Sequence, residues 1–515
     1  MPDRKPFYIT TPIYYVNDSP HIGHAYTTLA CDVLARFMRL DGHEVHFLTG
    51  TDEHGQKVEK AAAAAGVSPE EFTNRVSQTF RALPGALNFS NDDFIRTTEP
   101  RHISASQAIW RALEDSGHIY LGSYAGWYAV RDEAFYAELE LTKQADGRRF
   151  APSGAEVEWV EEPSYFFRLS AWQDKLMEFY VSNPDFIAPE SRRNEVLRFV
   201  RGGLRDLSVS RTTFKWGVPV PGDDDHIMYV WLDALTNYIT AVGYPDTDSD
   251  RFKQFWPADL HMVGKDILRF HAVYWPAFLM AAGIEPPKRI YAHGWWTNEG
   301  EKISKSLGNV IDPHALIETY GLDPVRYFLM REVPFGNDGD FSHHSMMHRM
   351  NGDLANDLGN LCQRVLSMIT KNCDGRVPAH GGFTDADNSL LGKAEGLIEA
   401  LRQSMRKQQF HTALIDIWEV VGDANRYVDL QAPWTLRKTD PARMETVLYV
   451  LAETIRCIGL YVQPFMPAAA GAILDQIAVT DRDFDALGHR LESGPKLPKP
   501  TPVFPRFVED DKAGG

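Results

Sequence analysis

The sequence predicts an α/β fold in the N-terminal part of the chain and an all-α helix bundle in the C-terminal part. Residues 7–13 are rich in β-branched and aromatic residues, as buried strands are, and an amphipathic helical pattern and a second apolar strand follow them. Beyond Phe341, apolar residues recur at helical spacings. A chain of 515 residues is long enough to form roughly two to four domains.

The composition is that of a soluble globular protein, with 44% hydrophobic residues and a net charge of −17. The chain does not open with a basic and then apolar leader, and it contains no run of about eighteen uncharged apolar residues. We therefore expect a cytoplasmic protein with no membrane partner. The negative charge opposes general coating of DNA or RNA, so any RNA contact requires a local basic surface.

The four cysteines, Cys31, Cys362, Cys373 and Cys457, lie far apart in the sequence. Their spacing matches neither a disulfide framework nor a zinc cluster of cysteines. We expect a reducing compartment.

The first predicted strand, residues 7–13, is followed by Pro20 and by the word His21-Ile22-Gly23-His24. A helix is predicted to begin near His21 and to end at Asp41-Gly42, where glycine permits a left-handed cap. The apolar face of this helix consists of Ile22, Tyr26, Leu29, Val33, Phe37 and Leu40. Residues 44–49 form the second predicted strand, which completes a strand, helix, strand unit.

The start of this helix is a candidate phosphate site, because unsatisfied amides and the helix dipole attract anions there. His21 and His24 share the first turn, and their ring N–H groups can donate to a triphosphate even when neutral. Gly23 allows the nucleotide to approach the backbone closely. Two alternatives stay open on spacing alone: solvated capping histidines, or two ligands of an incomplete metal site.

The four-residue word and its flanks resemble class I aminoacyl-tRNA synthetases, and the methionyl-tRNA synthetases in particular. The flanks are residues 10–17 (Thr-Thr-Pro-Ile-Tyr-Tyr-Val-Asn) and residues 48–55 (Leu-Thr-Gly-Thr-Asp-Glu-His-Gly). Asp52 stands just past the second strand, on the edge where ligands of open α/β sheets bind. It matches the family residue that holds the substrate ammonium.

The resemblance implies a split Rossmann-like parallel-sheet catalytic domain with a connective insertion, followed by an all-α anticodon-binding helix bundle. The expected parts are a first catalytic half at 1–116, the insertion at 117–211, a second catalytic half at 212–297, a Lys-Ile-Ser-Lys-Ser loop and stem-contact region at 298–345, and the bundle with a C-terminal tail at 346–515.

Many relatives carry Cys-x-x-Cys pairs that hold zinc in the insertion. Here Ala129 and Asp132 fall where the first pair would be, and residues 151–154 (Ala-Pro-Ser-Gly) replace the second. Zinc needs about four thiolate or imidazole donors, so we predict no structural zinc. An aromatic core is expected to hold the insertion together, formed by Trp127, Tyr128, Phe135, Tyr136, Trp159, Tyr165, Phe166 and Phe167.

A basic stretch ends the insertion, with Arg192, Arg193, Arg198, Arg201, Arg205 and Arg211. It fits a solvated helix face or a contact with the tRNA acceptor strand, and the sequence leaves both open.

The second catalytic half begins with residues 229–238, which on sequence alone read as core. The resemblance implies that this segment helps to wall the methionine pocket. The expected methionine-binding residues are Ile13, Tyr15, Asp52, Trp231, Ala234, Leu235, Tyr238, Ile267 and His271. Aromatic edges suit a polarizable sulfur, contributing about 0.3 to 1.5 kcal/mol. Gly264, Asp266 and Gly294 match family positions that receive the adenosine.

Residues 299–308 (Glu-Gly-Glu-Lys-Ile-Ser-Lys-Ser-Leu-Gly) form a polar loop that alone fits an ordinary solvated surface. Together with the histidine word, the loop becomes the second class I signature, which implies that Lys302, Ser304 and Lys305 bind ATP. The methionine carboxylate must attack the α-phosphorus of ATP, so the site must supply positive charge. We expect His21, His24, Lys302, Lys305 and a phosphate-bound Mg²⁺ to supply it.

The C-terminal third is predicted to be a helix bundle, with helices around residues 354–368, 414–428 and 446–463. Asn360 and Arg364 share a helix face, and Pro433 interrupts the chain beside Trp434. These four residues fit a surface pair plus a core tryptophan, or groups that read unpaired bases. The resemblance to the family's CAU anticodon segments favours the second. The tail from Lys496 lacks an added RNA-binding domain, so we expect a monomer.

The sequence therefore predicts a methionine–tRNA ligase that uses L-methionine, ATP and tRNA(Met), including the initiator tRNA. A synthetase for leucine, isoleucine or valine shares both signatures, but a chain this short lacks room for their editing insertion. A small nucleotidyltransferase has no need of the helical third. An RNA-binding protein without catalysis has no reason to keep both phosphate-handling segments.

Overall fold

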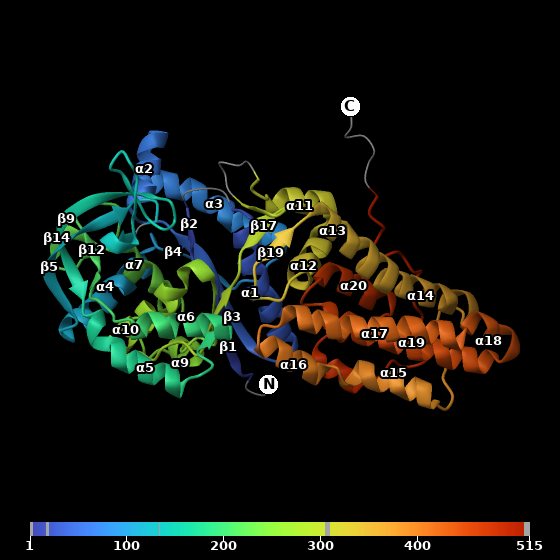
Figure 1. Cartoon of the computed structure of the whole chain (residues 1–515). Helices are drawn as coiled ribbons and strands as arrows, with labels where there is room; N and C mark the ends of the chain where they lie inside the picture. Colours follow the sequence, from blue (N-terminus) through green and yellow to red (C-terminus); the bar gives the residue numbers. More distant parts are fainter. Residues whose placement is uncertain (1–3, 17–19, 133, 304–308, 509–515) are drawn as a thin grey trace. The chain divides into compact units, whose positions relative to one another are not determined.

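The computed structural model describes residues 4–16, 20–132, 134–303 and 309–508, and Figure 1 traces the chain. The chain divides into two compact units. Residues 6–20 and 46–292 form the first, called here the sheet unit. Residues 1–5, 21–45 and 293–515 form the second, called here the helical unit.

A seven-stranded sheet with the order β10-β16-β15-β1-β3-β2 lies mainly in the sheet unit, with β4 paired to β3. Its strands are β1 (Pro6–Thr10), β2 (Tyr14–Tyr15), β3 (Glu44–Asp52), β4 (Asp93–Arg96), β10 (Ile187–Ala188), β15 (Leu260–Gly264) and β16 (Ile290–His293). The registers β1–β15, β10–β16, β2–β3 and β3–β4 are all parallel. This confirms the predicted α/β class.

Both predicted strands form, with shifted ends. β1 stops at Thr10 because Pro12 lacks an N–H for the ladder, although the Thr11 amide still donates to the Leu48 carbonyl at 3.0 Å. β3 runs on to Asp52, past the predicted end at Thr49, and its last seven residues are buried. The extension places Asp52 at the carboxyl end of a central strand.

Residues 117–211 contain a second, six-stranded sheet of order β6-β5-β9-β8-β7, with β11 on β9. Its strands are β5 (Ile119–Ala129), β6 (Ala134–Tyr136), β7 (Thr142–Lys143), β8 (Arg149–Phe150), β9 (Glu156–Phe167) and β11 (Leu207–Ser208). The same range also contains β10, which pairs with β16 in the parallel sheet. Part of the expected insertion therefore belongs to the main sheet.

The expected aromatic core of the insertion does not form as one cluster. Small aliphatic residues fill the tip instead, with Trp127, Tyr136 and Leu141 packed against them: Ala129, Ala151, Ala155 and Val157. Trp159 is 55% exposed, whereas Phe167 packs on Phe278 in the main core.

The helices of the sheet unit are α2 (Gln56–Ala65), α3 (Pro69–Leu87), α4 (Pro100–Asp115), α5 (Gln173–Ser182), α6 (Glu190–Arg201), α7 (Val230–Leu235), α8 (Asn237–Thr240), α9 (Asp250–Phe255) and α10 (Trp275–Ala281). Three short strands, β12 (Ser210–Arg211), β13 (Pro219–Val220) and β14 (Asp223–Met228), form a separate sheet. Arg198 and Arg201 are exposed on α6, whereas Arg211 is buried and lies over the Tyr229 ring. Arg211 is thus not part of a basic surface.

The helical unit begins with α1 (Ile22–Leu40) and a small sheet of β17 (Trp296–Asn298), β18 (Glu301–Lys302) and β19 (Gly339–Phe341). Its other helices are α11 (Pro313–Tyr320), α12 (Leu322–Arg331), α13 (His343–Arg349), a π-helix at Met350–Gly359, α14 (Asn360–Asn372), α15 (Asp385–Gly396), α16 (Ile398–Arg406), α17 (Phe410–Gln431), α18 (Pro433–Thr439), α19 (Pro441–Val462) and α20 (Pro467–Gln476).

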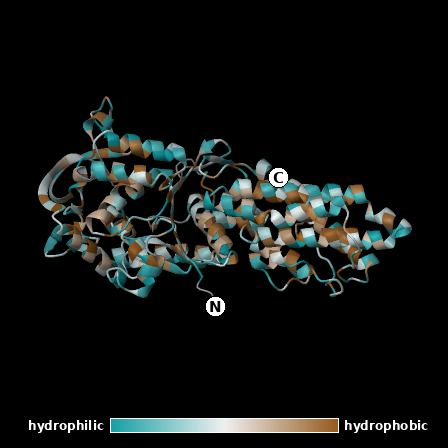
Figure 2. Ribbon diagram, turned by 90° about the horizontal axis from the view of Figure 1, so that it is seen from below, coloured by the Kyte–Doolittle hydropathy of each residue, from teal (hydrophilic) through white to brown (hydrophobic). Residues whose placement is uncertain are grey.

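The C-terminal helices form the predicted bundle around α19, which is buried from Thr446 to Val462 and contacts α14, α15, α17, α18 and α20. The surrounding helices carry hydrophobic segments interrupted by hydrophilic ones, as amphipathic helices do (Figure 2). α19 begins at Pro441, earlier than predicted, because the Asp440 side chain caps it and proline suits the first helical turn.

Candidate active site

Three neighbouring strands of the parallel sheet end beside residues predicted to bind ligand. β1 is followed by Ile13, β3 ends at Asp52, and β15 ends at Gly264 and leads to Asp266. Because β15, β1 and β3 are adjacent in that order, their carboxyl ends lie at one edge of the sheet. The sheet order alone thus brings residues some 250 positions apart in sequence to one place. Thr10 Oγ1, for example, lies 2.8 Å from His261 Nδ1.

Two of the predicted methionine-binding residues, Tyr238 and His271, are buried and joined by a hydrogen bond. The Tyr238 hydroxyl lies 2.7 Å from His271 Nε2, and His271 Nδ1 lies 3.0 Å from the Ile267 carbonyl oxygen. A carbonyl only accepts, so the Nδ1 carries the ring proton and the Tyr238 hydroxyl donates to Nε2. Burial lowers the pKa of His271 to about 4, so this imidazole is neutral at pH 7.

The other predicted pocket residues lie on three segments. Trp231 stacks face to face on Phe270, with ring centroids 3.5 Å apart and planes within 6°. The Tyr15 hydroxyl donates to the His54 carbonyl at 2.8 Å. Ile13, Trp231 and Ile267 pack at the edge of the main core, in which Leu235 is buried, and Ala234 is buried as well. Ile13, Trp231 and Ile267 thus pack against one and the same core of the sheet unit.

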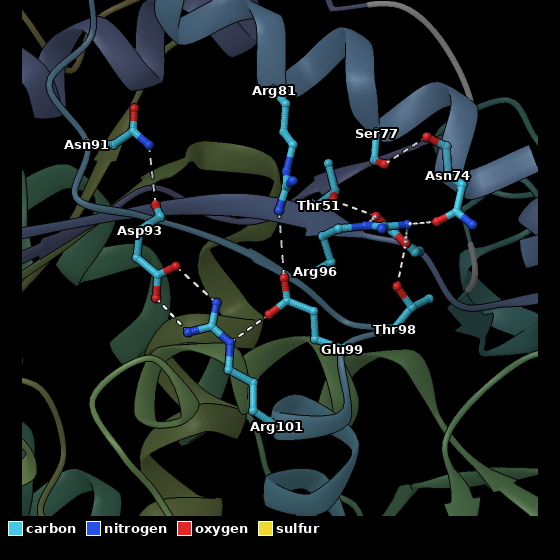
Figure 3. Close-up of polar contacts among 11 residues, drawn as sticks. Thr51, Asn74, Ser77, Arg81, Asn91, Asp93, Arg96, Thr98, Glu99 and Arg101 are labelled. Atoms are coloured by element: carbon cyan, nitrogen blue, oxygen red, sulfur yellow. Dashed lines mark hydrogen bonds and ion pairs between the residues drawn. The ribbon is translucent and has the colours of Figure 1, made fainter.

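Asp52 is 4% exposed and is followed by Glu53, whose side chain is completely buried. Thr51, Arg96 and Thr98 donate to the Glu53 carboxylate at 2.7 to 2.8 Å. These three donors are labelled in Figure 3. Arg96 also donates to Asn74 at 2.6 Å. Every oxygen of this buried charge is therefore paired, which fixes the backbone next to Asp52.

Sequence reasoning missed Asp233, a completely buried carboxylate on α7. It lies 2.7 Å from His54 and 2.7 Å from His102. Burial alone would raise its pKa, but the two histidines hold the pKa of Asp233 below its usual range. A charged residue between apolar neighbours in residues 229–238 was the one available sign in the sequence.

The helical unit holds the histidine word at the start of α1. His21 is the N-cap, and its Nδ1 accepts the Gly23 N–H at 3.0 Å, while His24 Nδ1 accepts the His21 N–H at 3.1 Å. Both Nδ1 atoms accept, so each neutral ring carries its proton on Nε2. Burial, and then the neighbouring His21, lower the pKa of His24 well below its usual value. The first turn has no acidic residue.

Both glycines predicted to receive ATP here have a packing reason as well. A Cβ at Gly23 would lie 2.9 Å from the His21 ring, and one at Gly294 would lie 2.2 Å from the Asn337 carbonyl oxygen. In the sheet unit, a Cβ at Gly264 would lie 2.5 Å from an Asp266 carboxylate oxygen. Glycine is required at Gly294, where the neighbour is backbone, whereas a side chain at Gly23 or Gly264 would need the neighbouring His21 or Asp266 side chain to move.

The second signature is only partly described. Ser304 and Lys305 lie outside the described residues, and Lys302 is placed by its backbone on β18. The flanking residues meet, because the Asn298 side chain donates to the Asn309 carbonyl at 3.0 Å. The Ile22 N–H, in the first turn of α1, donates to the Ile311 carbonyl at 3.1 Å. The chain just after the second signature thus reaches the first signature.

The predicted anticodon residues lie on α14 and α18. Asn360 is exposed and Arg364 is half-buried, donating to Asp429 at 3.0 Å. Ala432 has a left-handed backbone (φ 44°) that ends α17, and Pro433 is buried at the start of α18. Trp434 is 49% exposed. The alternative of a core tryptophan is therefore excluded.

The chain matches the family described as tRNA synthetases class I (M) over residues 7–366, and the anticodon binding domain of methionyl tRNA ligase over residues 377–514. It is 59% identical over 512 residues to the methionine–tRNA ligase of Brucella suis, covering 99% of each chain. The chain belongs to the class I methionine–tRNA ligases. It is thus an enzyme that activates methionine with ATP as methionyl-adenylate and transfers the methionyl group to tRNA.

Comparison with solved structures leads to the same family. The chain matches Mycobacterium tuberculosis methionyl-tRNA synthetase in complex with methionyl-adenylate at a TM-score of 0.96 and 57% identity, covering 98% of this chain and 100% of that one. The free-state form from the same organism matches at a TM-score of 0.90 and 53% identity. Within the described residues, no helix has the length and apolar character to cross a bilayer, and no group of three or more potential metal-ligating side chains forms.

Proposed function

We propose that the methionine site of this ligase is the sheet edge formed by β15, β1 and β3. Asp52 binds the ammonium, because a buried carboxylate at the carboxyl end of β3 suits a cationic ligand. The apolar walls take the thioether: Ile13, Tyr15, Trp231, Ala234, Leu235, Tyr238, Ile267 and His271. The observation that carries this proposal is the adjacency of the three strands.

Gly264 and Asp266 at the same edge take the adenosine, and Gly294 of the helical unit has the same role. His21, Gly23 and His24 take the phosphates of ATP. With Nδ1 accepting from the backbone, each neutral ring has its proton on Nε2, and an Nε2–H can donate to a phosphate oxygen without a positive charge. Lys302, Ser304 and Lys305 stabilise the pyrophosphate as it leaves.

The first turn of α1 offers N–H donors and no carboxylate, so its residues fit the oxygens of a phosphate group and not a bare cation. We infer that Mg²⁺ binds to the phosphates of ATP, where it supplies charge neutralisation. The histidines then orient the same phosphates through hydrogen bonds, and no side chain serves as a covalent nucleophile.

The tRNA site that we propose reads the CAU anticodon, in initiator and elongator tRNA(Met) alike. Trp434 stacks on an unpaired base, and Asn360 and Arg364 donate to base edges. Pro433 acts by fixing the start of α18, because it is buried. We further propose that the enzyme is cytoplasmic and monomeric. Sedimentation of the purified protein tests the monomeric state.

The experiment for the substrate is amino-acid-dependent ATP–pyrophosphate exchange with each of the twenty amino acids. Methionine should support exchange far better than any other, with homocysteine the main competitor outside the twenty, because one methyl group changes binding by only about 1 to 3 kcal/mol. Equal exchange with leucine or valine would contradict the assignment.

A further inference from the structure

Asp233 joins separate segments of the proposed methionine site through one buried carboxylate. It lies within α7, whose residues Trp231, Ala234 and Leu235 are proposed to wall the pocket. One carboxylate oxygen lies 2.7 Å from His54 Nδ1, and the other lies 2.7 Å from His102 Nε2.

The two histidines come from different parts of the sheet unit. His54 follows Asp52 by two residues, and its own carbonyl accepts the Tyr15 hydroxyl at 2.8 Å. His102 lies on α4, where the Ser106 hydroxyl also meets its Nε2 at 3.1 Å. A single negative charge therefore connects α7, the segment after β3 and α4.

This connection depends on the charge of Asp233. A carboxylate accepts two N–H groups at once, whereas an asparagine amide offers one oxygen and one N–H₂ donor. With asparagine, one of the two histidines would face a donor, and it would lose its bond unless its ring proton moved to the other nitrogen. Asp233 and His102 are completely buried and His54 nearly so, which leaves little water to replace that bond.

We propose that Asp233 is a positioning residue for methionine binding. By holding His54, it fixes the distance between the Asp52 segment and the α7 wall, so that ammonium and thioether are recognised together. Between Asp52 and His54, the Glu53–Arg96 ion pair fixes the backbone of the same segment. The inference rests on the proposed role of Asp52.

The primary test measures ATP–pyrophosphate exchange with Asp233→Asn. The KM for methionine should rise about tenfold or more, since a buried charge-assisted bond is lost, while the KM for ATP stays within about twofold. A purely structural role would lower the unfolding temperature and leave the KM for methionine unchanged.

A second pair of variants keeps the test decisive if Asp233→Asn fails to fold. His102→Leu removes a donor to Asp233, whereas His102→Gln retains an amide donor at the same place. The side chain of His102 forms hydrogen bonds to Asp233, Ser106 and Thr240, and these three lie outside the proposed methionine-binding set. The KM for methionine should rise about threefold with leucine and return toward the parent value with glutamine.

His46→Gln is the matched control. His46 is equally buried on β3, but its side chain contacts Arg251 and the Tyr8 and Phe255 rings. The substitution should destabilise the fold without changing the KM for methionine.

Asp52→Asn separates the positioning role of Asp233 from the proposed ammonium site at Asp52. If Asp52→Asn raises the KM for methionine while Asp233→Asn and His102→Leu leave it within about twofold of the parent, the positioning role is overturned. If Asp52→Asn has no effect on that KM, the proposed ammonium site itself fails.

Discussion

The first turn of α1 and the methionine edge of the sheet are held in place by different kinds of contact. In α1, the donor of each bond to a histidine Nδ1 lies two or three residues away in the chain. At the sheet edge, His54 meets Asp233 across 179 residues, and Thr10 meets His261 across 251. The bonds to the two Nδ1 atoms in α1 come from nearby backbone, whereas the bonds at the sheet edge join distant segments of the sheet unit.

This difference has a functional consequence. Phosphate-handling groups fixed by local bonds should be sensitive mainly to substitutions at the site itself. Methionine recognition should also respond to buried residues that never touch the ligand, such as Asp233. Four predictions test this contrast.

The largest effect is expected for Asp52→Asn. Removing one partner of a buried ion pair costs about 3 to 5 kcal/mol, so kcat/KM for methionine should fall on the order of 10³-fold in pyrophosphate exchange. The KM for ATP should change little. Asp115→Asn, at an exposed position, is the control. A loss confined to ATP binding would contradict the division between the two sites.

His24→Ala should lower kcat for exchange by about 10²-fold, because one preorganised donor to the phosphates is lost. The KM for methionine should stay within about twofold. Because His24 Nδ1 accepts the His21 N–H, the double variant His21→Ala/His24→Ala should cost less than the sum of the single ones. Independent, additive losses would show that the two rings do not act as a unit.

Trp434→Ala should raise the KM for tRNA in aminoacylation by about tenfold, since stacking on one base contributes about 1 to 3 kcal/mol. Exchange without tRNA should not change. A tRNA with an altered anticodon provides the control, because the variant and the parent should charge it equally poorly. If the substitution raises the KM for both tRNAs by the same factor, Trp434 does not recognise the anticodon.

The smallest effect concerns acid stability. Burial lowers the pKa of both His271 and His46 to about 4, so between roughly pH 4 and 6.5 the unfolded chain binds more protons than the folded one. Stability should therefore fall as the pH drops through this window. His271→Gln should flatten the slope of unfolding temperature against pH, whereas exposed His344→Gln should not. An unchanged slope in His271→Gln would contradict neutral burial.

The sequence predicted local features well. The helix beginning at His21, the strand from Glu44 and the long C-terminal helices all form, because spacing and capping act over a few residues. Capping, one of the alternatives for His21, does not exclude the predicted phosphate role, since the ring caps the helix through Nδ1 and the proton of the neutral ring is then on Nε2. A sequence pattern does not show which ring nitrogen of a histidine carries the proton.

Contacts between residues far apart in the sequence could not be predicted. Asp233 pairs with two histidines whose distance along the chain no local pattern encodes. The aromatic residues of the insertion were expected to pack together, yet Trp159 is exposed and Phe167 joins the main core, because strand register decides which side of the hairpin each ring faces. β10 likewise pairs with β16 in the parallel sheet, and no local sequence pattern predicts that pairing.

The central claim, that Asp52 at the sheet edge reads the methionine ammonium, is tested most directly by a cycle of two inhibitors and two proteins. Methioninol keeps the ammonium and thioether, and 4-(methylthio)butan-1-ol lacks only the ammonium. The parent should bind methioninol on the order of 10²-fold more tightly, and Asp52→Asn should abolish that difference. A preference for methioninol that persists undiminished in Asp52→Asn would contradict the account.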